Sequence, residues 1–203
     1  MGDTRVLTVH KSAPGWASLM AVPALVGQKH VKVKVCLVGD VAVGKTSLIK
    51  RYVQDAFEDR YVATVGTKVT KKTVDVMWKG ANASLDMMVW DIMGEKGFRA
   101  LLRDAYFEGS HGVIAVCDMT RKDTFYDLNN WVQMIRKQVG NVPIVFLGNK
   151  FDLKERLVVS EEELARMGTI HNAKHFVTSA KTGQGVNEAF KVLGDAIAHG
   201  GDT

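Results

Sequence analysis

The chain has 203 residues, 46% of them hydrophobic, which is enough for one α/β domain with a full core. Its formal net charge is +5, but no basic run is long enough to predict binding to nucleic acid. No apolar run reaches the roughly 18 residues of a transmembrane helix, and neither Cys36 nor Cys117 has the spacing of a zinc site. These features predict a cytoplasmic protein without a transmembrane segment, and we expect it to be a monomer.

Residues 1–30 are predicted to form an N-terminal extension, because no regular pattern begins before Val31. Arg5–His10 has the composition of a strand, so the extension is interpreted either as a short extra strand or as a flexible tail. An N-myristoylation site needs Ser or Thr at position 6, where this chain has Val6. We therefore expect any peripheral contact with membranes to be indirect or to involve this extension.

Strands and helices alternate from Val31 onward. The predicted strands are 31–38, 65–77, 84–90, 113–117, 144–147 and 175–177. The predicted helices are 45–53, 125–139, a short helix opened by the capping box of Ser160 and Glu163, and 186–197. Lys79–Asn82 predicts a hairpin between the second and third strands. This alternation predicts a mainly parallel sheet with helices on both faces, whose ligand-binding loops follow the strands along one edge.

The segment after the first strand, Gly39–Thr46, matches the phosphate-binding pattern G-x-x-x-x-G-K-[ST] between a strand and a helix. Its glycines let the backbone wrap around phosphate oxygens, and the helix N-terminus adds positive potential. Lys45 is expected to reach the β- and γ-phosphates, and the Thr46 hydroxyl to bind Mg²⁺. The nucleotide-binding residues predicted here are Asp40, Val41, Ala42, Val43, Gly44, Lys45, Thr46 and Ser47.

Asp91 ends an apolar strand at the same edge of the predicted sheet. A carboxylate in this place suits a second contact to the metal through a water molecule. An acidic residue after a strand is common, so the interpretation depends on its combination with Lys45 and Thr46. The sequence therefore predicts an Mg²⁺ site shared by the phosphate-binding loop and the end of this strand.

Two short segments after later strands predict the binding of a guanine base. Guanine presents two donors, N1–H and the 2-amino group, and the single carboxylate of Asp152 can accept both, whereas adenine lacks this pair. The Asn149 amide suits the other side of the base, and the stem of Lys150 can lie against its ring. The segment after the last strand, Thr178-Ser179-Ala180-Lys181, can offer a backbone N–H to the guanine oxygen, and its predicted site residues are Ser179, Ala180 and Lys181.

These motifs and their order resemble those of a Rab-like small GTPase of the Ras superfamily over residues 31 to about 199. The matching residues are Trp90-Asp91, Phe98-Arg99, Leu101, Tyr106-Phe107, Gly112-Val113-Ile114, Phe125, Leu128, Trp131, Asn149-Lys150-Phe151-Asp152 and Ser179-Ala180-Lys181. The resemblance implies a P-loop NTPase fold with a mostly parallel six-stranded sheet and about five helices at 31–199, followed by a tail at 200–203. It also implies a GTPase that binds GTP or GDP with Mg²⁺ and acts as a switch in signal transduction and vesicle trafficking.

The resemblance assigns two nucleotide-sensing segments, at about 57–66 and 91–105, to which effector, exchange-factor and activating proteins bind. Thr64 resembles the threonine that contacts Mg²⁺ and the γ-phosphate in the GTP state, and Gly94 resembles a glycine that donates its N–H to this phosphate. Phe57 resembles the aromatic residue that packs on the base, although a core position would also explain it. The catalytic residues implied are Lys45, Thr64, Gly94 and Glu95.

The family's usual run Asp-Thr-Ala-Gly-Gln is replaced here by Asp91-Ile92-Met93-Gly94-Glu95. The glutamine orients the attacking water, whereas an ionised Glu95 only accepts hydrogen bonds and carries a charge near the γ-phosphate. Val41 stands where relatives often have a smaller residue, and its branched side chain can obstruct the same region. We therefore expect slow hydrolysis; the alternative is an essentially non-hydrolysing, GTP-bound scaffold.

Two further features and one alternative class of protein bear on function. Arg60 precedes Thr64 by four residues and is interpreted either as an internal arginine finger or as a solvated loop charge. Residues 200–203 include no cysteine, so no prenylation site is expected in this chain. A P-loop nucleotide kinase is a third class of protein to consider, but the Asn149–Asp152 motif argues against it.

Overall fold

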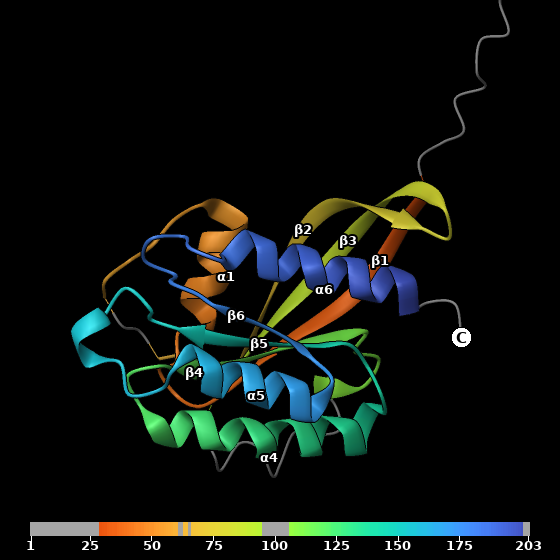
Figure 1. The fold of residues 1–203 in the computed structure, drawn as a ribbon. Helices are drawn as coiled ribbons and strands as arrows, with labels where there is room; N and C mark the ends of the chain where they lie inside the picture. Colours follow the sequence, from red (N-terminus) through yellow and green to blue (C-terminus); the bar gives the residue numbers. More distant parts are fainter. Residues whose placement is uncertain (1–28, 61–62, 65, 95–105, 201–203) are drawn as a thin grey trace, which may run out of the picture.

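The computed structural model describes residues 29–60, 63–64, 66–94 and 106–200. Most of the predicted N-terminal extension, residues 95–105 with Glu95, and the tail from residue 201 lie outside these ranges. The described part is a six-stranded sheet with helices on both faces, as the sequence predicts (Figure 1).

The strand order in the sheet is β2-β3-β1-β4-β5-β6. The strands are β1 Lys29–Val38, β2 Thr67–Trp78, β3 Ala81–Ile92, β4 Gly112–Asp118, β5 Ile144–Asn149 and β6 Lys174–Val177. The β2–β3 pair is antiparallel, and the other four neighbouring pairs are parallel. β2 forms one edge of this sheet and exposes Lys68 and Lys71, while the opposite edge, β6, has four residues. Because these neighbouring pairs are parallel, the carboxyl ends of their strands lie along the same side of the sheet, and the predicted ligand loops follow them there.

The β2–β3 hairpin has a shorter turn than the sequence predicts. Its turn consists of Lys79 and Gly80, with φ of 52° and 77°, whereas Ala81 and Asn82 already pair with β2. Two consecutive residues with positive φ are typical of a type I′ turn, whose twist matches that of the flanking strands. This turn fixes the register of the hairpin and places Asp91 near the carboxyl end of β3.

Four α-helices lie in the described residues, against about five predicted. They are α1 Lys45–Gln54, α4 Lys122–Val139, α5 Glu161–His171 and α6 Val186–Gly200, and a 3₁₀ helix, η1, covers Lys154–Arg156. The predicted capping box opens α5, because Ser160 Oγ accepts from the Glu163 N–H at 3.2 Å and Glu163 Oε2 accepts from the Ser160 N–H at 2.9 Å. No helix in the described ranges combines the length and apolar character that crossing a bilayer requires.

The sheet separates two hydrophobic cores, because successive side chains of a strand point to opposite faces. Val35 and Leu37 of β1 belong to the core under α1 and α6, whereas Cys36 and Val38 belong to the core under α4 and α5. The two helix pairs lie on opposite sides of the sheet in Figure 1. Burial on both faces holds the strands rigidly and fixes the positions of the loops that follow them.

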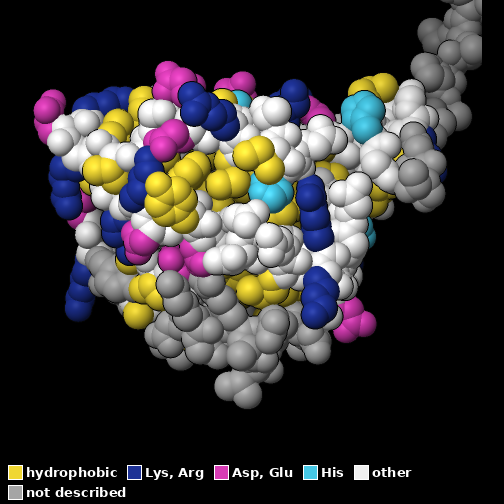
Figure 2. Space-filling model, turned by 60° about the horizontal axis from the view of Figure 1, so that its bottom comes forward, with side chains coloured by type: hydrophobic (Ala, Val, Ile, Leu, Met, Phe, Trp, Pro, Cys, Tyr) yellow, Lys and Arg dark blue, Asp and Glu magenta, His cyan; other side chains and the backbone are white. Residues whose placement is uncertain are grey.

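Both cysteines are buried. Burial raises the pKa of Cys117 to about 12, so its thiol stays protonated and unreactive at neutral pH. On the other face, the Tyr52 and Phe190 rings stack with centroids 3.9 Å apart and join α1 to α6. The surface in Figure 2 carries acidic and basic side chains interspersed with hydrophobic ones.

Candidate functional site

The loops at the carboxyl edge of the sheet surround a cavity of about 330 Å³. Sites for small organic ligands are on the order of 300–1,000 Å³, so the cavity is large enough for one. The predicted nucleotide-binding residues that line it are Val41, Ala42, Gly44, Lys45, Thr46, Ser47, Phe57, Thr64, Gly94, Asn149, Lys150, Asp152, Ala180 and Lys181. The remaining three, Asp40, Val43 and Ser179, are buried and contact lining residues.

Two glycines of the phosphate-binding loop occupy positions that no other residue fits. Gly39 has a φ of 137°, and a Cβ there would lie 2.2 Å from the Val116 carbonyl oxygen. Gly44 has a φ of 101°, and a Cβ there would lie 2.3 Å from Asn149 Nδ2. The left-handed backbone and the close packing therefore both require glycine, and the loop lies tightly against β4 and the end of β5.

Lys45 carries a buried positive charge at the beginning of α1, where its side chain bridges the phosphate-binding loop. It is 7% exposed, and its Nζ donates to the carbonyls of Gly39 at 2.8 Å and Asp40 at 2.9 Å. The first turn of α1 contains no acidic residue, so the ammonium adds to the positive potential of the helix N-terminus. A Cβ on Gly94 would lie 2.7 Å from Lys45 Nζ, so the Gly94 backbone approaches the same place. This arrangement attracts an anion such as a phosphate chain.

Three predicted metal-site residues meet beside the cavity. Thr46 Oγ1 donates to Asp91 Oδ2 at 2.5 Å and lies 2.9 Å from Thr64 Oγ1. Asp91 is 2% exposed, and burial raises the pKa of its carboxyl group. Its second oxygen, Oδ1, is buried and has no hydrogen-bond partner among the described residues. A buried carboxylate oxygen without a partner is costly, so the site favours a cation.

These residues fit Mg²⁺, which prefers oxygen ligands and keeps several of its waters. The described ranges contain no group of three or more His, Cys, Asp or Glu side chains that could hold a metal alone. Thr46, Thr64 and Asp91 therefore supply only part of a coordination shell. Phosphate oxygens and water are the natural source of the rest, which suits a metal that binds together with a nucleotide.

The base side of the cavity, formed by Asn149, Asp152, Ser179 and Ala180, is held together by its own hydrogen bonds. Ser179 Oγ donates to Asp152 Oδ1 at 2.6 Å, which fixes the orientation of the carboxylate. Asn149 is 1% exposed; its Oδ1 accepts from the Ala180 N–H at 3.2 Å, and its Nδ2 donates to the Val43 carbonyl at 2.8 Å. In this structure Asn149 therefore connects the base side to the phosphate-binding loop.

Arg51 supports the same loop, although the sequence did not single it out. Its Nε donates to the Ala180 carbonyl at 2.9 Å and its Nη2 to the Lys181 carbonyl at 2.7 Å. Arg51 lies on α1, two turns after Lys45, so the helix that begins at the phosphate-binding loop also holds the loop after β6. No local pattern in the sequence indicates this contact, because its partners are 129 and 130 residues away.

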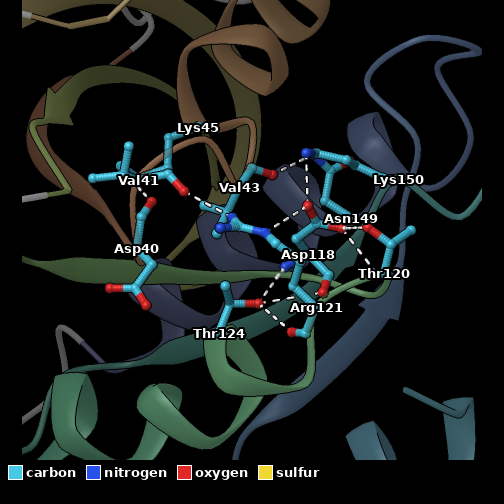
Figure 3. Close-up of polar contacts among 10 residues, drawn as sticks. All are labelled: Asp40, Val41, Val43, Lys45, Asp118, Thr120, Arg121, Thr124, Asn149 and Lys150. Atoms are coloured by element: carbon cyan, nitrogen blue, oxygen red, sulfur yellow. Dashed lines mark hydrogen bonds and ion pairs between the residues drawn. The ribbon is translucent and has the colours of Figure 1, made fainter. Parts of the chain in front are cut away.

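Asp118 organises a second set of contacts that sequence reasoning missed (Figure 3). Its carboxylate, 2% exposed, lies 2.6 Å from Lys150 Nζ and accepts from Arg121 Nε at 3.1 Å and from the Thr120 hydroxyl at 2.7 Å. Burial acts to raise the pKa of Asp118, but hydrogen bonds from Lys150 and Thr120 outweigh it and hold the pKa below its usual value. The sequence could have indicated Asp118, because it is an acidic residue at the end of a buried strand, the same feature that identified Asp91 on β3.

Phe57 and Arg60, each with two interpretations from the sequence, line the cavity together with Val41. Phe57 is half-buried, packs against the core under α1 and α6, and also lines the cavity, so both of its proposed roles are geometrically compatible. Arg60 is exposed and lines the cavity. Val41 is 40% exposed and lines it as well, as expected for a side chain that borders the phosphate region.

The site has a glycine-containing loop between a buried strand and a helix, and a buried lysine and a threonine begin that helix. This arrangement defines the class of P-loop nucleotide-binding proteins. The model of the Ras family matches residues 34–199. Among similar proteins, the Ras-related protein Rab-13 of Canis lupus familiaris is 35% identical over 161 residues, which are 79% of this chain and 77% of that protein. The Ras-related protein Rab-21 is 35% identical in Geodia cydonium, over 84% of this chain and 72% of the relative, and 37% identical in Homo sapiens, over 77% and 68%.

The chain therefore belongs to the Ras family, and its relatives are Rab proteins. The prediction of a Rab-like small GTPase of the Ras superfamily is confirmed, and so is the α/β fold of a small G domain. Membership of this family makes the protein a GTP-binding switch of the GTPase class.

Proposed function

We propose that the chain is an Mg²⁺-dependent GTP/GDP switch whose intrinsic hydrolysis is slow. The observation that carries this proposal is that Asp152 and Lys45 line one and the same cavity. The carboxylate matches the paired donors of guanine, and the ammonium matches a phosphate chain. A ligand that satisfies both groups is a guanosine phosphate.

Recognition of guanine is supported by the rigid setting of Asp152. The hydrogen bond from Ser179 at 2.6 Å orients the carboxylate before any ligand arrives. Adenine would leave this carboxylate without its paired donors, and an unsatisfied group in a desolvated site is costly. The aliphatic stem of Lys150 is the proposed neighbour of the ring, and its ammonium is anchored 2.6 Å from Asp118 Oδ2.

In the proposed phosphate site, Lys45 binds the β- and γ-phosphates while Thr46 and Thr64 hold Mg²⁺, with Asp91 acting through water. The metal supplies positive charge that neutralises the phosphate oxygens. Gly94 donates its N–H to the γ-phosphate, and the contact distances of its position with Asp40 and Lys45 leave no room for a side chain. Thr64 and Gly94 belong to segments 57–66 and 91–105, so loss of the γ-phosphate would release both segments.

Slow hydrolysis rests on two residues near the γ-phosphate position. Val41 is exposed toward the cavity and occupies space that a water-orienting side chain or a partner's arginine would use. Glu95 lies outside the described residues, and its carboxylate chemistry alone motivates the proposal. The alternative, a GTP-bound scaffold with negligible turnover, follows from the same two residues if they block the reaction completely.

We further propose that effector, exchange-factor and activating proteins bind residues 57–66 and 91–105, in keeping with a role in vesicle trafficking. The G domain is assigned to residues 31–199, with 1–30 as an extension. Contact with membranes would be peripheral, either through a partner or through this extension.

Calorimetry with GTP and ATP in the presence of Mg²⁺ tests the nucleotide assignment. We expect GTP to bind more tightly than ATP by a factor on the order of 1,000 or more, because adenine lacks the two donors that the Asp152 carboxylate accepts from guanine. Equal affinities, or no binding of either nucleotide, would contradict the proposal. Chelation of Mg²⁺ should weaken GTP binding in the same experiment.

Single-turnover GTP hydrolysis separates a slow switch from a locked scaffold. We expect wild type to turn over slowly, and Glu95→Gln and Val41→Gly to turn over faster. If wild type is as fast as its relatives and Glu95→Gln is no faster, the proposal of slow hydrolysis is wrong. The nucleotide that remains bound after purification gives an independent measure, because GTP indicates a scaffold and GDP a working hydrolase.

A further inference from the structure

Arg121 reaches from the loop between β4 and α4 to the phosphate-binding loop. Its Nη2 donates to the Val41 carbonyl at 2.7 Å, and its Nε donates to Asp118 Oδ2 at 3.1 Å. Figure 3 shows the guanidinium between these two acceptors. The side chain thus uses two N–H donors of its planar guanidinium to join segments that are 80 residues apart in the sequence.

The base of this bridge is rigid. Asp118 Oδ1 accepts from the Thr120 N–H at 2.9 Å and from the Thr120 hydroxyl at 2.7 Å, and Lys150 contacts Oδ2. The Thr124 hydroxyl donates to the Arg121 carbonyl at 2.8 Å and accepts from the Asp118 N–H at 3.0 Å. The Arg121 side chain therefore extends from a loop whose backbone and Asp118 carboxylate are already held by hydrogen bonds. Its pair with Asp118 thus differs from an ordinary ion pair between two mobile surface side chains.

The contact with Val41 determines how a peptide of the phosphate-binding loop is oriented. The described peptide bonds include no cis bond, and in a trans peptide the C=O and the following N–H point in opposite directions. Holding the Val41 carbonyl toward Arg121 therefore turns the N–H of Ala42, which lines the cavity, away from Arg121. Asn149 fixes the Val43 carbonyl in the same way. These two contacts keep loop carbonyls away from the place where phosphate oxygens would bind.

The same bridge connects the phosphate-binding loop to the base side. Asp118 accepts from both Arg121 and Lys150, and Lys150 lines the cavity beside Asp152. The Met119 N–H donates to the Asn149 carbonyl at 3.0 Å, which ties the two loops a second time. Movement of the phosphate-binding loop would therefore disturb the base side through Arg121 and Asp118.

We infer that Arg121 is a positioning residue that holds the phosphate-binding loop in its nucleotide-binding conformation and thereby slows nucleotide release. The inference rests on the proposed function, because it concerns the same cavity. Arg121 does not line the cavity, so it acts through Val41 and not on the nucleotide itself. A partner that draws Arg121 away from Val41 would accelerate release.

The test is the release rate of fluorescent GDP from Arg121→Ala, Arg121→Lys and the control Arg166→Ala. Arg166 is exposed on α5, so its removal deletes the same charge elsewhere on the surface. We expect about tenfold faster release from Arg121→Ala, since a charge-assisted hydrogen bond is lost. Arg121→Lys keeps the charge but not the planar fork and should also release GDP faster than wild type. Arg166→Ala should match wild type.

A second measurement distinguishes positioning of the phosphate-binding loop from a general loss of structure. GMP lacks the phosphates that extend along this loop, so Arg121→Ala should weaken the binding of GDP more than that of GMP. Equal weakening of both nucleotides would mean that the substitution acts on the whole site and would contradict the inference.

The release rates can also overturn the inference. Release from Arg121→Ala within about twofold of wild type would overturn the inference, given that loss of such a bond is expected to have a larger effect. So would equal acceleration in Arg166→Ala, or a wild-type rate in Arg121→Lys, because charge alone would then explain the result. If wild type itself does not retain GDP, the proposed function fails instead, and the two failures are therefore distinguishable.

Discussion

The two sides of the cavity differ in how far the chain satisfies its own polar groups. On the base side, both ends of the Asn149 amide and one oxygen of Asp152 have partners within the protein. On the metal side, formed by Thr46, Thr64 and Asp91, a buried carboxylate oxygen has no partner in the described part of the chain. The protein's own hydrogen bonds therefore hold most of the base side in place, whereas on the metal side they leave a buried carboxylate oxygen for a ligand.

The substitution Asp152→Asn should have the largest effect and tests whether the base side recognises guanine. An amide presents N–H groups to the donors of the base, so we expect GTP affinity to fall by about 1,000-fold. Calorimetry with Mg²⁺ measures this loss, and Ser179→Ala, which removes only the orienting hydroxyl, should lose less. A loss below about tenfold would show that the carboxylate does not pair with the base.

The substitution Asn149→Ala tests how far the base side is held together by the protein's own hydrogen bonds. It leaves the buried Val43 carbonyl and the Ala180 N–H without this partner, so we expect the free energy of unfolding to fall by about 3 kcal/mol. Urea denaturation of the nucleotide-free protein measures the change. Asn130 is the matched control, because its side chain is exposed on α4 and donates to Asp127 at 3.0 Å; Asn130→Ala should change little.

The substitution Asp91→Asn should have opposite effects on the free and loaded protein. Removing the unpaired buried charge should stabilise the nucleotide-free protein by about 1 kcal/mol, while the extra stability that Mg²⁺ gives the GDP complex should decrease. Thermal unfolding with and without GDP and Mg²⁺ measures both. Asp86 on the same strand is the control, because Lys71 and Thr73 contact its carboxylate. Asp86→Asn should therefore destabilise both the free and the loaded protein. If Asp91→Asn did the same, the proposed difference between the base side and the metal side would be wrong.

The smallest expected effect is a pH dependence at Asp118. Burial alone would raise its pKa, but the bonds from Lys150 and Thr120 hold it below the ordinary 3.8. The charged carboxylate therefore stabilises the folded state above pH 3.8, and this contribution is lost as pH falls through the pKa of the folded protein. Asp118→Asn lacks it, so the unfolding free energies of variant and wild type should converge on acidification. A constant difference between them across this range would contradict the assignment.

Local patterns in the sequence were sufficient for the sheet, the capping box and the phosphate-binding loop. Gly39, Gly44 and Lys45 are identifiable because close backbone approach and phosphate binding demand those residue types at that spacing. Asp152 and Asn149 were identified by their position after a buried strand. Their placement in one cavity follows from the parallel order of the strands, which the alternation of elements predicts.

Other contacts could not be predicted because they join distant segments through residues of ordinary type. Arg121 resembles any exposed arginine near a helix start until β4 places it beside Val41. Asn149 was expected to face the base, whereas its bonds to Val43 and Ala180 appear only once the strands are assembled. The hairpin turn was placed correctly in the sequence, but its two-residue length depends on the φ values of Lys79 and Gly80.

The edge strand β2 has a consequence for how copies of this protein behave together. An uncovered strand edge is a template for pairing with another chain, and exposed lysines oppose such pairing through charge repulsion and desolvation. β2 exposes the side chains of Lys68 and Lys71, the second of which pairs with Asp86, and β6 at the opposite edge is too short to offer a long template. We therefore expect Lys68 to oppose the pairing of a second chain with the β2 edge, while the four residues of β6 leave little to pair with at the other edge.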